Sequence, residues 1–454
     1  METMEPQPHR ANDPHVVGSQ SHLTDDATQA RARTLAREGV FPRVSLRDWL
    51  REKVFLGMTL REYARSLVTP FNLVAGLIIA VGFPFIVLRF VHGLGAVTSG
   101  SHVQPWGLFL AWGLFSGVPL SASGFVLGTA VYVFGLRRYH PVVNNAILIG
   151  FLGYFFAVVF LLIDLGRPWR IYYPVMISYG PASVLFLVGW HVFLYLSCQF
   201  LEFSPTIFGW AGAERLRRGA RSLTVGLTIF GIILSTLHQS ALGAMFLLMP
   251  GKVHPLWWSP YLPIFFLTSA IAAGISMVIV VSALVHRFFP GERNPRWTEQ
   301  LGELTLGMGK AVALTLFTYF GLKLVGVAHG NHWGLLGTSP WGWWFLTELL
   351  GFVLLPCLLL VLALKRGSVS LVRLGALWTI LGTIINRFNV SLITFNWNLP
   401  HRELFEWKEA MIILTVVVIE ILVYRWIILR MPVVPEHPAY REGEGEGEGE
   451  AHHD

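Results

Sequence analysis

Ten long apolar stretches, separated by short polar connections, dominate the chain. A helix that crosses a bilayer core of about 30 Å needs about 20 apolar residues, because each helical residue adds about 1.5 Å. Ten segments reach that length: residues 68–92, 106–135, 141–164, 180–203, 219–248, 259–285, 304–329, 341–364, 369–395 and 407–430. The pattern therefore predicts an all-α protein, a polytopic membrane helical bundle of about ten transmembrane helices.

Polar regions flank this predicted bundle. Residues 1–40 are expected to be disordered, without a secretory signal pattern. The stretch VSLRDWLREKVFLGMTLREYARSL spaces apolar residues at helical intervals between arginines, which is typical of an interfacial helix and equally of a solvated one. The low-complexity end REGEGEGEGEAHHD has nothing to bury, so its histidines are read as tail residues and not as metal ligands. We therefore predict an N-terminal region over 1–66, a membrane domain over 67–431 and a disordered acidic tail over 432–454.

The composition and the charge distribution agree with a membrane protein. Hydrophobic residues make up 54% of the chain and charged residues only 13%, where soluble domains carry about 25% charged residues. Connections on the side of the two termini contain twelve Lys and Arg residues, against five on the opposite side. By the positive-inside rule both termini are expected in the cytoplasm. The net charge of +7 is explained by this bias, so no nucleic-acid partner is implied.

Tryptophan gathers at one face of the predicted bundle. Ten of the 17 tryptophans lie at or next to the predicted outer ends of the spans: Trp106, Trp169, Trp257, Trp258, Trp333, Trp341, Trp343, Trp344, Trp397 and Trp407. An aromatic belt would be expected on both faces of a membrane. The one-sided excess indicates an outer surface that binds something apolar or docks a protein.

Five predicted helices carry ionisable side chains at a similar shallow depth. Counting inward from the outer ends, Asp164 lies at the boundary, Lys323, Glu348 and Arg387 about 9 to 12 Å deep, and His238 about 15 Å deep. Each costs about 3 kcal/mol to insert unless it is paired or faces a cavity. We expect these groups to face one another around a pocket for an amphiphilic head group. The alternative is a set of structural ion pairs that lock the bundle.

Further polar residues extend the predicted pocket. Gln239, Asn386 and Asn389 are able to hydrogen-bond to carbonyl oxygens, while Glu420 lies deeper, about 20 Å from the outer end. In the stretch LLIDLGRPWR, a glycine and a proline are expected to end the third span. The chain would then turn so that Arg167 pairs with Asp164 or meets a docked partner.

Two other readings stay open at this point. His191 and His238 lie at similar depths in the fourth and fifth spans, so they are a candidate pair of haem ligands. Ten helices with a carboxylate near the midplane would also suit a secondary transporter, although no convincing repeat relates the two halves. The two cysteines, Cys198 and Cys357, lie inside apolar stretches and offer neither a disulfide framework nor a thiolate metal site. No metal site is predicted.

The chain resembles a known family over about residues 54–435. The resemblance is carried by the strings LGMTLREYARSLVTPFN, VYVFGLRRYHPVVNNAIL, FLGYFFAVVFLLIDLGRPWR, TLHQSALGAMFLLMPGKVHPLWWSP and VVIEILVYRWIILRMPVVP. They are similar to the HybB-type membrane subunits of hydrogenase-2-type complexes, within the wider NrfD and polysulfide-reductase membrane family. The resemblance implies a bundle built around two four-helix units.

The resemblance also implies a function and site residues. Such a subunit exchanges electrons between a menaquinone or other quinone and a ferredoxin-like iron-sulfur subunit, which docks on the periplasmic side of the bacterial inner membrane beside its catalytic subunit. Iron-sulfur clusters are then expected in the partner only, and no haem is expected. Asp164, Gly166 and Arg167 match a family motif near the quinone site, and His238 and Gln239 match another.

From these matches we expect His238 and Asp164 to be the immediate proton donors or hydrogen-bond partners of the quinone. Glu348 and Glu420 are the expected relay, with Lys323 and Arg387 tuning them, and His254 is expected at the rim of the pocket.

The sequence departs from the family pattern at two places. Leu187 stands where an acidic residue is common, and Asn144 and Asn145 stand where an arginine or a proline is common. If the missing carboxylate belongs to a proton path, proton translocation is in doubt while electron transfer is not.

Overall fold

The structure is a computed structural model that describes residues 45–101, 105–290, 294–400 and 402–438. It divides into two compact units, Met1–Ser66 and Leu67–Asp454. In the first unit, the predicted interfacial helix is two short helical segments. The first is α2 (Leu46–Trp49) continued by η1 (Leu50–Val54), and the second is α3 (Leu60–Ser66). Leu56 and Gly57 both have positive φ, which ends the first segment.

The second unit confirms the all-α prediction. Among the described residues, ten helices are long and apolar enough to cross a membrane, and the only β pairing is an isolated bridge between Val253 and Phe395. The ten spans are Pro70–His92 (α4), Leu110–Val133 (η3 Leu110–Ser116, α5 Gly117–Leu120, α6 Ser123–Gly128 and η4 Thr129–Val133), Arg137–Asp164 (η5 Arg137–Tyr139 and α7 His140–Asp164), Val184–Ala211 (α9), Thr224–Leu248 (α11 Thr224–Ala244 and η7 Met245–Leu248), Leu262–Phe288 (α12), Pro295–His329 (α13), Pro340–Lys365 (α14 Pro340–Leu346, η9 Thr347–Leu354 and α15 Leu355–Lys365), Val369–Ile393 (α16 Val369–Phe388 and η10 Asn389–Ile393) and Trp407–Ile428 (α17).

Short helices lie between some of the spans. They are η2 (Leu94–Ala96), η6 (Pro168–Arg170), α8 (Tyr173–Met176), α10 (Glu214–Ser222) and η8 (His332–Leu335). The predicted spans match the observed ones in number and order, with shifted ends. The fourth span begins at Val184, after Ser183 caps it by accepting from the Phe186 N–H. The seventh begins at Pro295, after the Asn294 cap.

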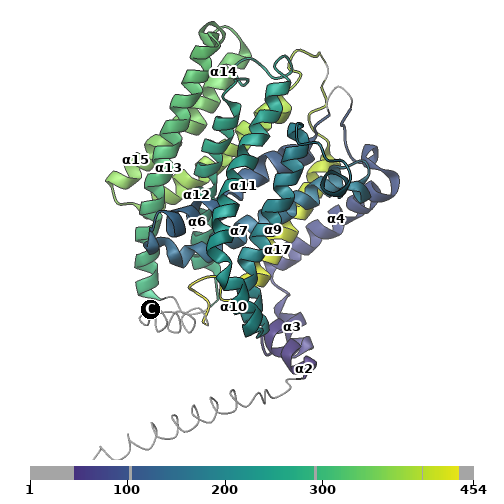
Figure 1. The fold of residues 1–454 in the computed structure, drawn as a ribbon, viewed down its shortest axis with the longest axis vertical. Coiled ribbons are helices and arrows are strands. Elements are labelled where there is room, and N and C mark those ends of the chain that lie inside the picture. Colours follow the sequence, from purple (N-terminus) through teal and green to yellow (C-terminus); the bar gives the residue numbers. More distant parts are fainter. Residues whose placement is uncertain (1–44, 102–104, 291–293, 401, 439–454) are drawn as a thin grey trace, which may run out of the picture. The chain divides into compact units, whose positions relative to one another are not determined.

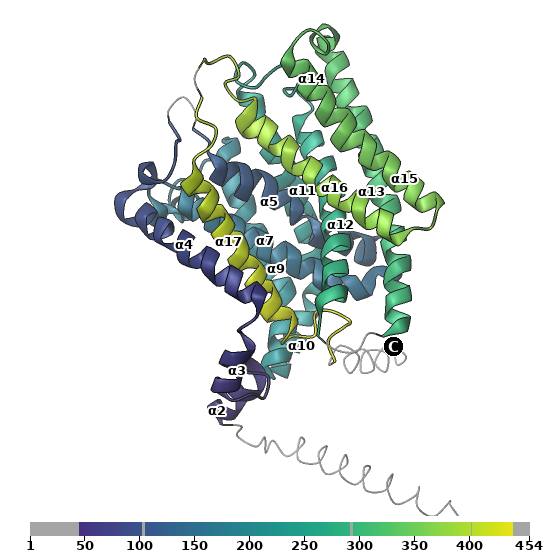
Figure 2. The ribbon, with the colours of Figure 1, turned by 180° about the vertical axis from the view of Figure 1, so that it is seen from behind.

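The ten spans pack as two groups of four and one pair. The second to fifth spans form one group, in which α9 packs against α7 and α11, and the sixth to ninth form the other, in which α12 packs against α13 and α16. The two groups meet where α12 contacts α5, α6 and α11. The first and last spans, α4 and α17, run side by side along one flank (Figure 1, Figure 2). We call the two groups the first and second four-helix units.

The bundle has two ends that carry different connections, with α14 toward one end and α10 toward the other (Figure 1). We call the end with Asp164 and His254 the outer end and the end with Asn145 and Trp297 the inner end, following the predicted orientation. At the outer end, the loops after the fifth and ninth spans pair through the Val253–Phe395 bridge, so they form one layer over both four-helix units.

The C-terminal segment remains packed against the protein beyond residue 432, where the disordered tail was predicted to begin. Val433 and Val434 are buried, and Glu436 accepts a hydrogen bond from Trp297 Nε1 at 2.7 Å. The described chain ends at residue 438. The acidic stretch and the terminal histidines lie outside the described residues.

Candidate functional site

The predicted polar layer is divided between two separate clusters. Glu348, Lys323, Asn386 and Arg387 lie together in the second four-helix unit. Among the described residues, no hydrogen bond or ion pair joins His238 to them. The expectation that all these groups face one another is therefore wrong. Depth along a helix placed them in one layer, but the helices that carry them belong to different four-helix units.

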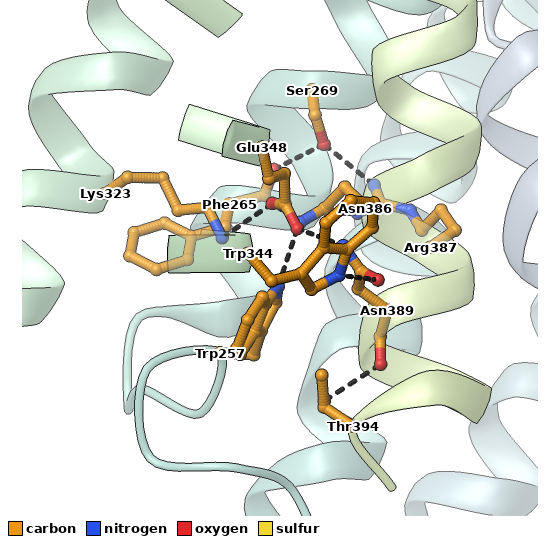
Figure 3. Close-up of polar contacts among 10 residues, drawn as sticks. All are labelled: Trp257, Phe265, Ser269, Lys323, Trp344, Glu348, Asn386, Arg387, Asn389 and Thr394. Atoms are coloured by element: carbon orange, nitrogen blue, oxygen red, sulfur yellow. Dashed lines mark hydrogen bonds and ion pairs between the residues drawn. The ribbon is translucent and has the colours of Figure 1, made fainter. Parts of the chain in front are cut away.

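The first cluster is built around the carboxylate of Glu348 (Figure 3). Its Oε1 lies 3.5 Å from Lys323 Nζ and accepts from Asn386 Nδ2 at 2.7 Å. Its Oε2 accepts from Trp257 Nε1 at 2.6 Å and from Asn389 Nδ2 at 2.5 Å. Both carboxylate oxygens are thus fully engaged, which offsets the cost of burying the charge.

Arg387 extends this cluster toward α12. Its guanidinium donates to Asn386 Oδ1 at 2.9 Å, to Ser269 Oγ at 2.8 Å and to the Phe266 carbonyl at 3.1 Å. The guanidinium carbon also lies 3.6 Å from the centre of the Phe266 ring, a cation–π contact. The cluster therefore ties η9, α12, α13 and the end of α16 together.

Local backbone geometry directs these side chains inward. The helix that carries Glu348 is π-helical over Thr347–Leu354, and the one that carries Asn389 is π-helical over Asn389–Ile393. A π-helical turn changes the face that successive residues present. Asn386 and Asn389, three residues apart at the junction of α16 and η10, share a face of the helix, and both reach Glu348.

The second cluster surrounds His238 in the first four-helix unit. His238 and Gln239 of α11 are completely buried. The Gln239 amide donates to the Val118 carbonyl at 3.2 Å and to the Tyr154 hydroxyl at 3.4 Å. The His238 ring lies 5.6 Å from the Tyr154 ring, measured between centres, and Tyr154 in turn packs edge-on against Tyr195 at 4.5 Å.

This second cluster differs from the first in its unused hydrogen-bonding capacity. Among the described residues, neither ring nitrogen of His238 has a hydrogen-bond partner, and neither do the side-chain oxygens of Gln239 and Gln199. Buried polar atoms usually find partners. The His238 cluster thus has donors and acceptors available to a bound group, whereas the Glu348 carboxylate has none to spare.

The third span ends where the sequence predicts, but its final carboxylate has a different neighbour. The helix α7 ends at Asp164 and Leu165 is extended. Asp164 makes no ion pair with Arg167, which is exposed. Instead, Arg89 of α4 donates to the carbonyl oxygens of Ile163 and Leu165 on either side of it and interacts electrostatically with Asp164. The proposed pairing with Arg167 is therefore wrong.

A second buried carboxylate, Glu409, lies near Asp164. Its oxygens accept from the Thr98 hydroxyl and, at 2.9 Å, from the Leu108 N–H, and it interacts electrostatically with Asp164. Gly107 leaves room for it, because a Cβ there would lie 2.7 Å from Glu409 Oε1. Arg89, Asp164 and Glu409 thus form a compact charged group where α4, α7 and α17 meet at the outer end.

Glu420 lies away from both clusters. It is half-buried on α17 and, within the described part of the chain, makes no hydrogen bond or ion pair. Tyr424, one turn further along, donates to Asn145 Oδ1 at 2.6 Å, so this face of α17 points toward α7. Glu420 is not joined to Glu348 by any contact between described residues.

His254 lies in the outer layer, directly above the Glu348 cluster. Its ring is surrounded by those of Trp257, Trp341 and Trp397, with centres 4.7 to 5.5 Å away. Its Nδ1 accepts from the Leu256 N–H at 3.2 Å. Burial, and secondly the nearby His332, lower the pKa of His254 to about 4, so it is neutral near pH 7.

Several residues of these clusters were missed in the sequence. Tyr154, Tyr195 and Gln199 are polar positions inside apolar spans, a signal that was available. Arg89 and Glu409 were not singled out because charges near span ends are common at the interface. In the described part of the chain, no group of three or more His, Cys, Asp or Glu residues is placed to hold a metal ion.

Comparison with known proteins identifies the family. The sequence profile described as polysulphide reductase, NrfD, matches residues 96–395, well over half of the chain. A protein of Nitratidesulfovibrio vulgaris is 43% identical over 380 residues, which cover 83% of this chain and 98% of that protein. The probable Ni/Fe-hydrogenase 2 b-type cytochrome subunit of Escherichia coli is 30% identical over 370 residues, 80% of this chain and 92% of the relative.

A third relative is described by its substrate. The integral membrane subunit of menaquinone reductase from Nitratidesulfovibrio vulgaris is 25% identical over 329 residues, 66% of this chain and 75% of that subunit. The last two relatives are thus described as subunits of a hydrogenase and of a menaquinone reductase. With its ten apolar helices and the profile match over residues 96–395, the chain belongs to the NrfD family of oxidoreductase membrane subunits.

Proposed function

We propose that this chain is the quinone-reacting membrane subunit of a respiratory oxidoreductase of the bacterial inner membrane. It exchanges electrons between an iron-sulfur subunit at the outer end and a menaquinone-type quinone, with both termini in the cytoplasm. The family and the menaquinone reductase relative support this function. The partner's catalytic subunit is of the hydrogenase or molybdopterin-enzyme type, and the membrane subunit has no catalysis of its own without it.

The single observation that carries the proposal is the environment of His238. This histidine is buried, and among the described residues neither its two ring nitrogens nor the side-chain oxygen of the adjacent Gln239 has a hydrogen-bond partner. A neutral imidazole is able to donate a hydrogen bond to a quinone carbonyl through one ring nitrogen, and to transfer that proton while its other nitrogen takes one up. We therefore assign the contact with the head group to His238, and a structural role to the Glu348 cluster, whose carboxylate is already saturated.

The outer end offers the surface for the iron-sulfur partner. Arg167 and Arg170 are exposed there, and the large apolar side chains Trp169, Met176 and Tyr179 are 69 to 74% exposed. Exposed aromatic residues and arginines are enriched at protein interfaces. Crosslinking from the partner to this segment is expected, with none to α10 at the inner end.

We also propose that the chain binds no haem, although one relative is described as a b-type cytochrome subunit. His191 and His238 do interact electrostatically, but the helices that carry them are closely packed. Cys198 Sγ lies 3.1 Å from the Leu227 carbonyl, and a Cβ at Gly231 would meet that sulfur at 3.4 Å. The Tyr154 ring also occupies the space beside His238. A stoichiometric b-type spectrum in the purified complex would contradict this proposal.

The function is tested with His238→Ala in the assembled complex. Quinone-linked turnover should fall about 100-fold, the usual size of a lost proton donor, while turnover with an artificial dye and assembly with the partner stay at the parent level. The matched control is His140→Ala, because His140 is exposed at the start of α7. If His238→Ala retains parent quinone turnover, His238 is a structural residue. Uptake of a solute by the chain alone in liposomes would instead favour a transporter.

A further inference from the structure

We propose that a polar column between α9 and α11 conducts protons between Glu202, toward the inner end, and His238. The column consists of Glu202, Tyr195, Gln199, Ser235, Tyr154 and His238. This inference rests on the proposed function, because it supplies the protons that quinone chemistry at His238 requires. It adds a carboxylate and a route that the motif matches do not contain.

The spacing of the polar residues places them on facing sides of two packed helices. On α9, Tyr195, Gln199 and Glu202 follow one another at intervals of four and three residues, and on α11 Ser235 and His238 are three apart. Residues at these intervals share one face of a helix. Since α9 and α11 pack against each other along their length, the two faces form one continuous seam.

The inner part of the column is a carboxylate held in place by a hydroxyl. Thr228 of α11 donates to Glu202 Oε1 at 2.7 Å, which fixes the Glu202 side chain toward the seam. Glu202 is half-buried, and it interacts electrostatically with Tyr195, two turns closer to His238. Carboxylates within membrane helices are rare, and they commonly mark ion or proton pathways.

The middle of the column is a group of hydroxyls and amides. The Gln199 amide donates to the Tyr195 hydroxyl. Ser235 Oγ lies beside the hydroxyls of both Tyr195 and Tyr154, without a hydrogen bond of standard geometry to either. The Tyr195 and Tyr154 rings are in edge contact, so the two hydroxyl groups approach Ser235 from neighbouring helices.

The outer part reaches His238. Tyr154 contacts the His238 ring and accepts a hydrogen bond from Gln239. All of these side chains apart from Glu202 are at least 99% buried. Among the described residues, four of the buried side-chain atoms without a hydrogen-bond partner, Gln199 Oε1, Ser235 Oγ and both His238 ring nitrogens, lie in this one seam. Buried polar atoms usually find partners, as both oxygens of the Glu348 carboxylate do.

The column supplies the proton for one of the two quinone oxygens in the proposed reaction. When a quinone is reduced, each carbonyl oxygen gains one electron from the iron-sulfur partner and one proton. His238 gives its N–H proton to the oxygen that it faces while its other ring nitrogen takes a proton from the column, and the second oxygen takes its proton from water. Each hydroxyl takes a proton on its inner side as it releases its own on the outer side, and Glu202 supplies the first proton and recovers it from the inner aqueous phase. Quinol oxidation runs the same steps in reverse.

The test uses the complete complex in proteoliposomes, with a short-chain menaquinone as substrate. Glu202→Gln retains an acceptor for Thr228 but has no proton to give, and Tyr195→Phe removes one hydroxyl from the middle. Each is expected to lower quinone-linked turnover at least 10-fold, while dye-linked turnover remains at the parent level. Glu303→Gln and Tyr424→Phe are the matched controls, an exposed glutamate and a half-buried tyrosine outside the column.

A second measurement does not depend on turnover. Dicyclohexylcarbodiimide reacts with protonated carboxyl groups in apolar surroundings, so it should label Glu202 in the parent complex, and Glu202→Gln should lose this label. Parent quinone turnover in both Glu202→Gln and Tyr195→Phe would overturn the column and leave the proposed function intact. Absence of quinone turnover in the parent complex would instead contradict the proposed function itself.

Discussion

The ammonium group of Lys323 lies 3.5 Å from Oε1 of Glu348, and only 3% and 1% of the two side chains is exposed. The ammonium also faces the rings of Phe265, Tyr319 and Phe345 at 5.3 to 5.9 Å. Charges buried in this way are stable only with partners. The pair therefore holds α13 and η9 together, whatever the second four-helix unit does in electron transfer.

Removing one member of this pair should destabilise the protein strongly. Glu348→Ala leaves Lys323 as an unpaired buried charge, which typically costs about 3 to 5 kcal/mol. The double variant Lys323→Met with Glu348→Leu should lose less than Glu348→Ala alone, because no charge remains unpaired. Thermal unfolding of the purified chain in detergent measures both. As a control, Glu214→Ala breaks the exposed pair with Arg217 and should cost less than about 1 kcal/mol.

Arg89 should stabilise the outer end of the third span. Its side chain is 2% exposed and bonds to the Ile163 and Leu165 carbonyls. The Ile163 carbonyl is among the last of α7, which have no partner within the helix, and the Leu165 carbonyl follows the helix end. Arg89→Met is expected to cost about 2 to 4 kcal/mol, since each charged hydrogen bond is worth about 1.5 to 3 kcal/mol. Arg215→Met, at an exposed position of α10, should be neutral in the same unfolding assay.

The two four-helix units should be sensitive to volume at Gly274. A Cβ at Gly274 of α12 would lie 2.7 Å from the backbone of Ala122 and Ser123, so an added methyl group would push the units apart. Gly274→Ala is expected to cost about 1 to 3 kcal/mol through overpacking. At Gly321 of α13 no atom lies within 4 Å of the added Cβ. There Gly321→Ala should be neutral or stabilising by up to about 1 kcal/mol, and equal effects at both glycines would contradict this account.

His254 should make the outer layer sensitive to acid. Its pKa of about 4 in the folded chain is below the usual value of 6.5, so between these values the unfolded chain binds a proton that the folded chain does not. Its contribution is therefore complete above about pH 6.5 and is lost as the pH falls toward 4. Unfolding temperatures measured between pH 7 and pH 4 should fall less in His254→Gln than in the parent. His140→Gln, at an exposed position, should follow the parent curve.

The sequence by itself determined the ten spans, their order and the end of the third helix at Asp164. These features depend on length, apolar composition and local breakers such as Gly166 and Pro168, all of which are properties of neighbouring residues in the chain. Sequence periodicity also gave the approximate depth of His238 and Glu348. It recovered the grouping of Lys323, Asn386 and Arg387 around Glu348, because buried charges need partners at the same depth.

Only the tertiary structure decided which helices are neighbours. The depth of a residue in the membrane follows from its position along its own helix. Which helices lie next to one another depends on how all ten pack, and no local sequence pattern specifies that. His238 was therefore expected beside Glu348, and it lies instead with Tyr154 in the other four-helix unit. Arg167 was expected either to pair with Asp164 or to meet a docked partner, and Asp164 lies instead beside Arg89, which is distant in sequence. Side chains bury their charge against whichever partner the packed helices bring within reach.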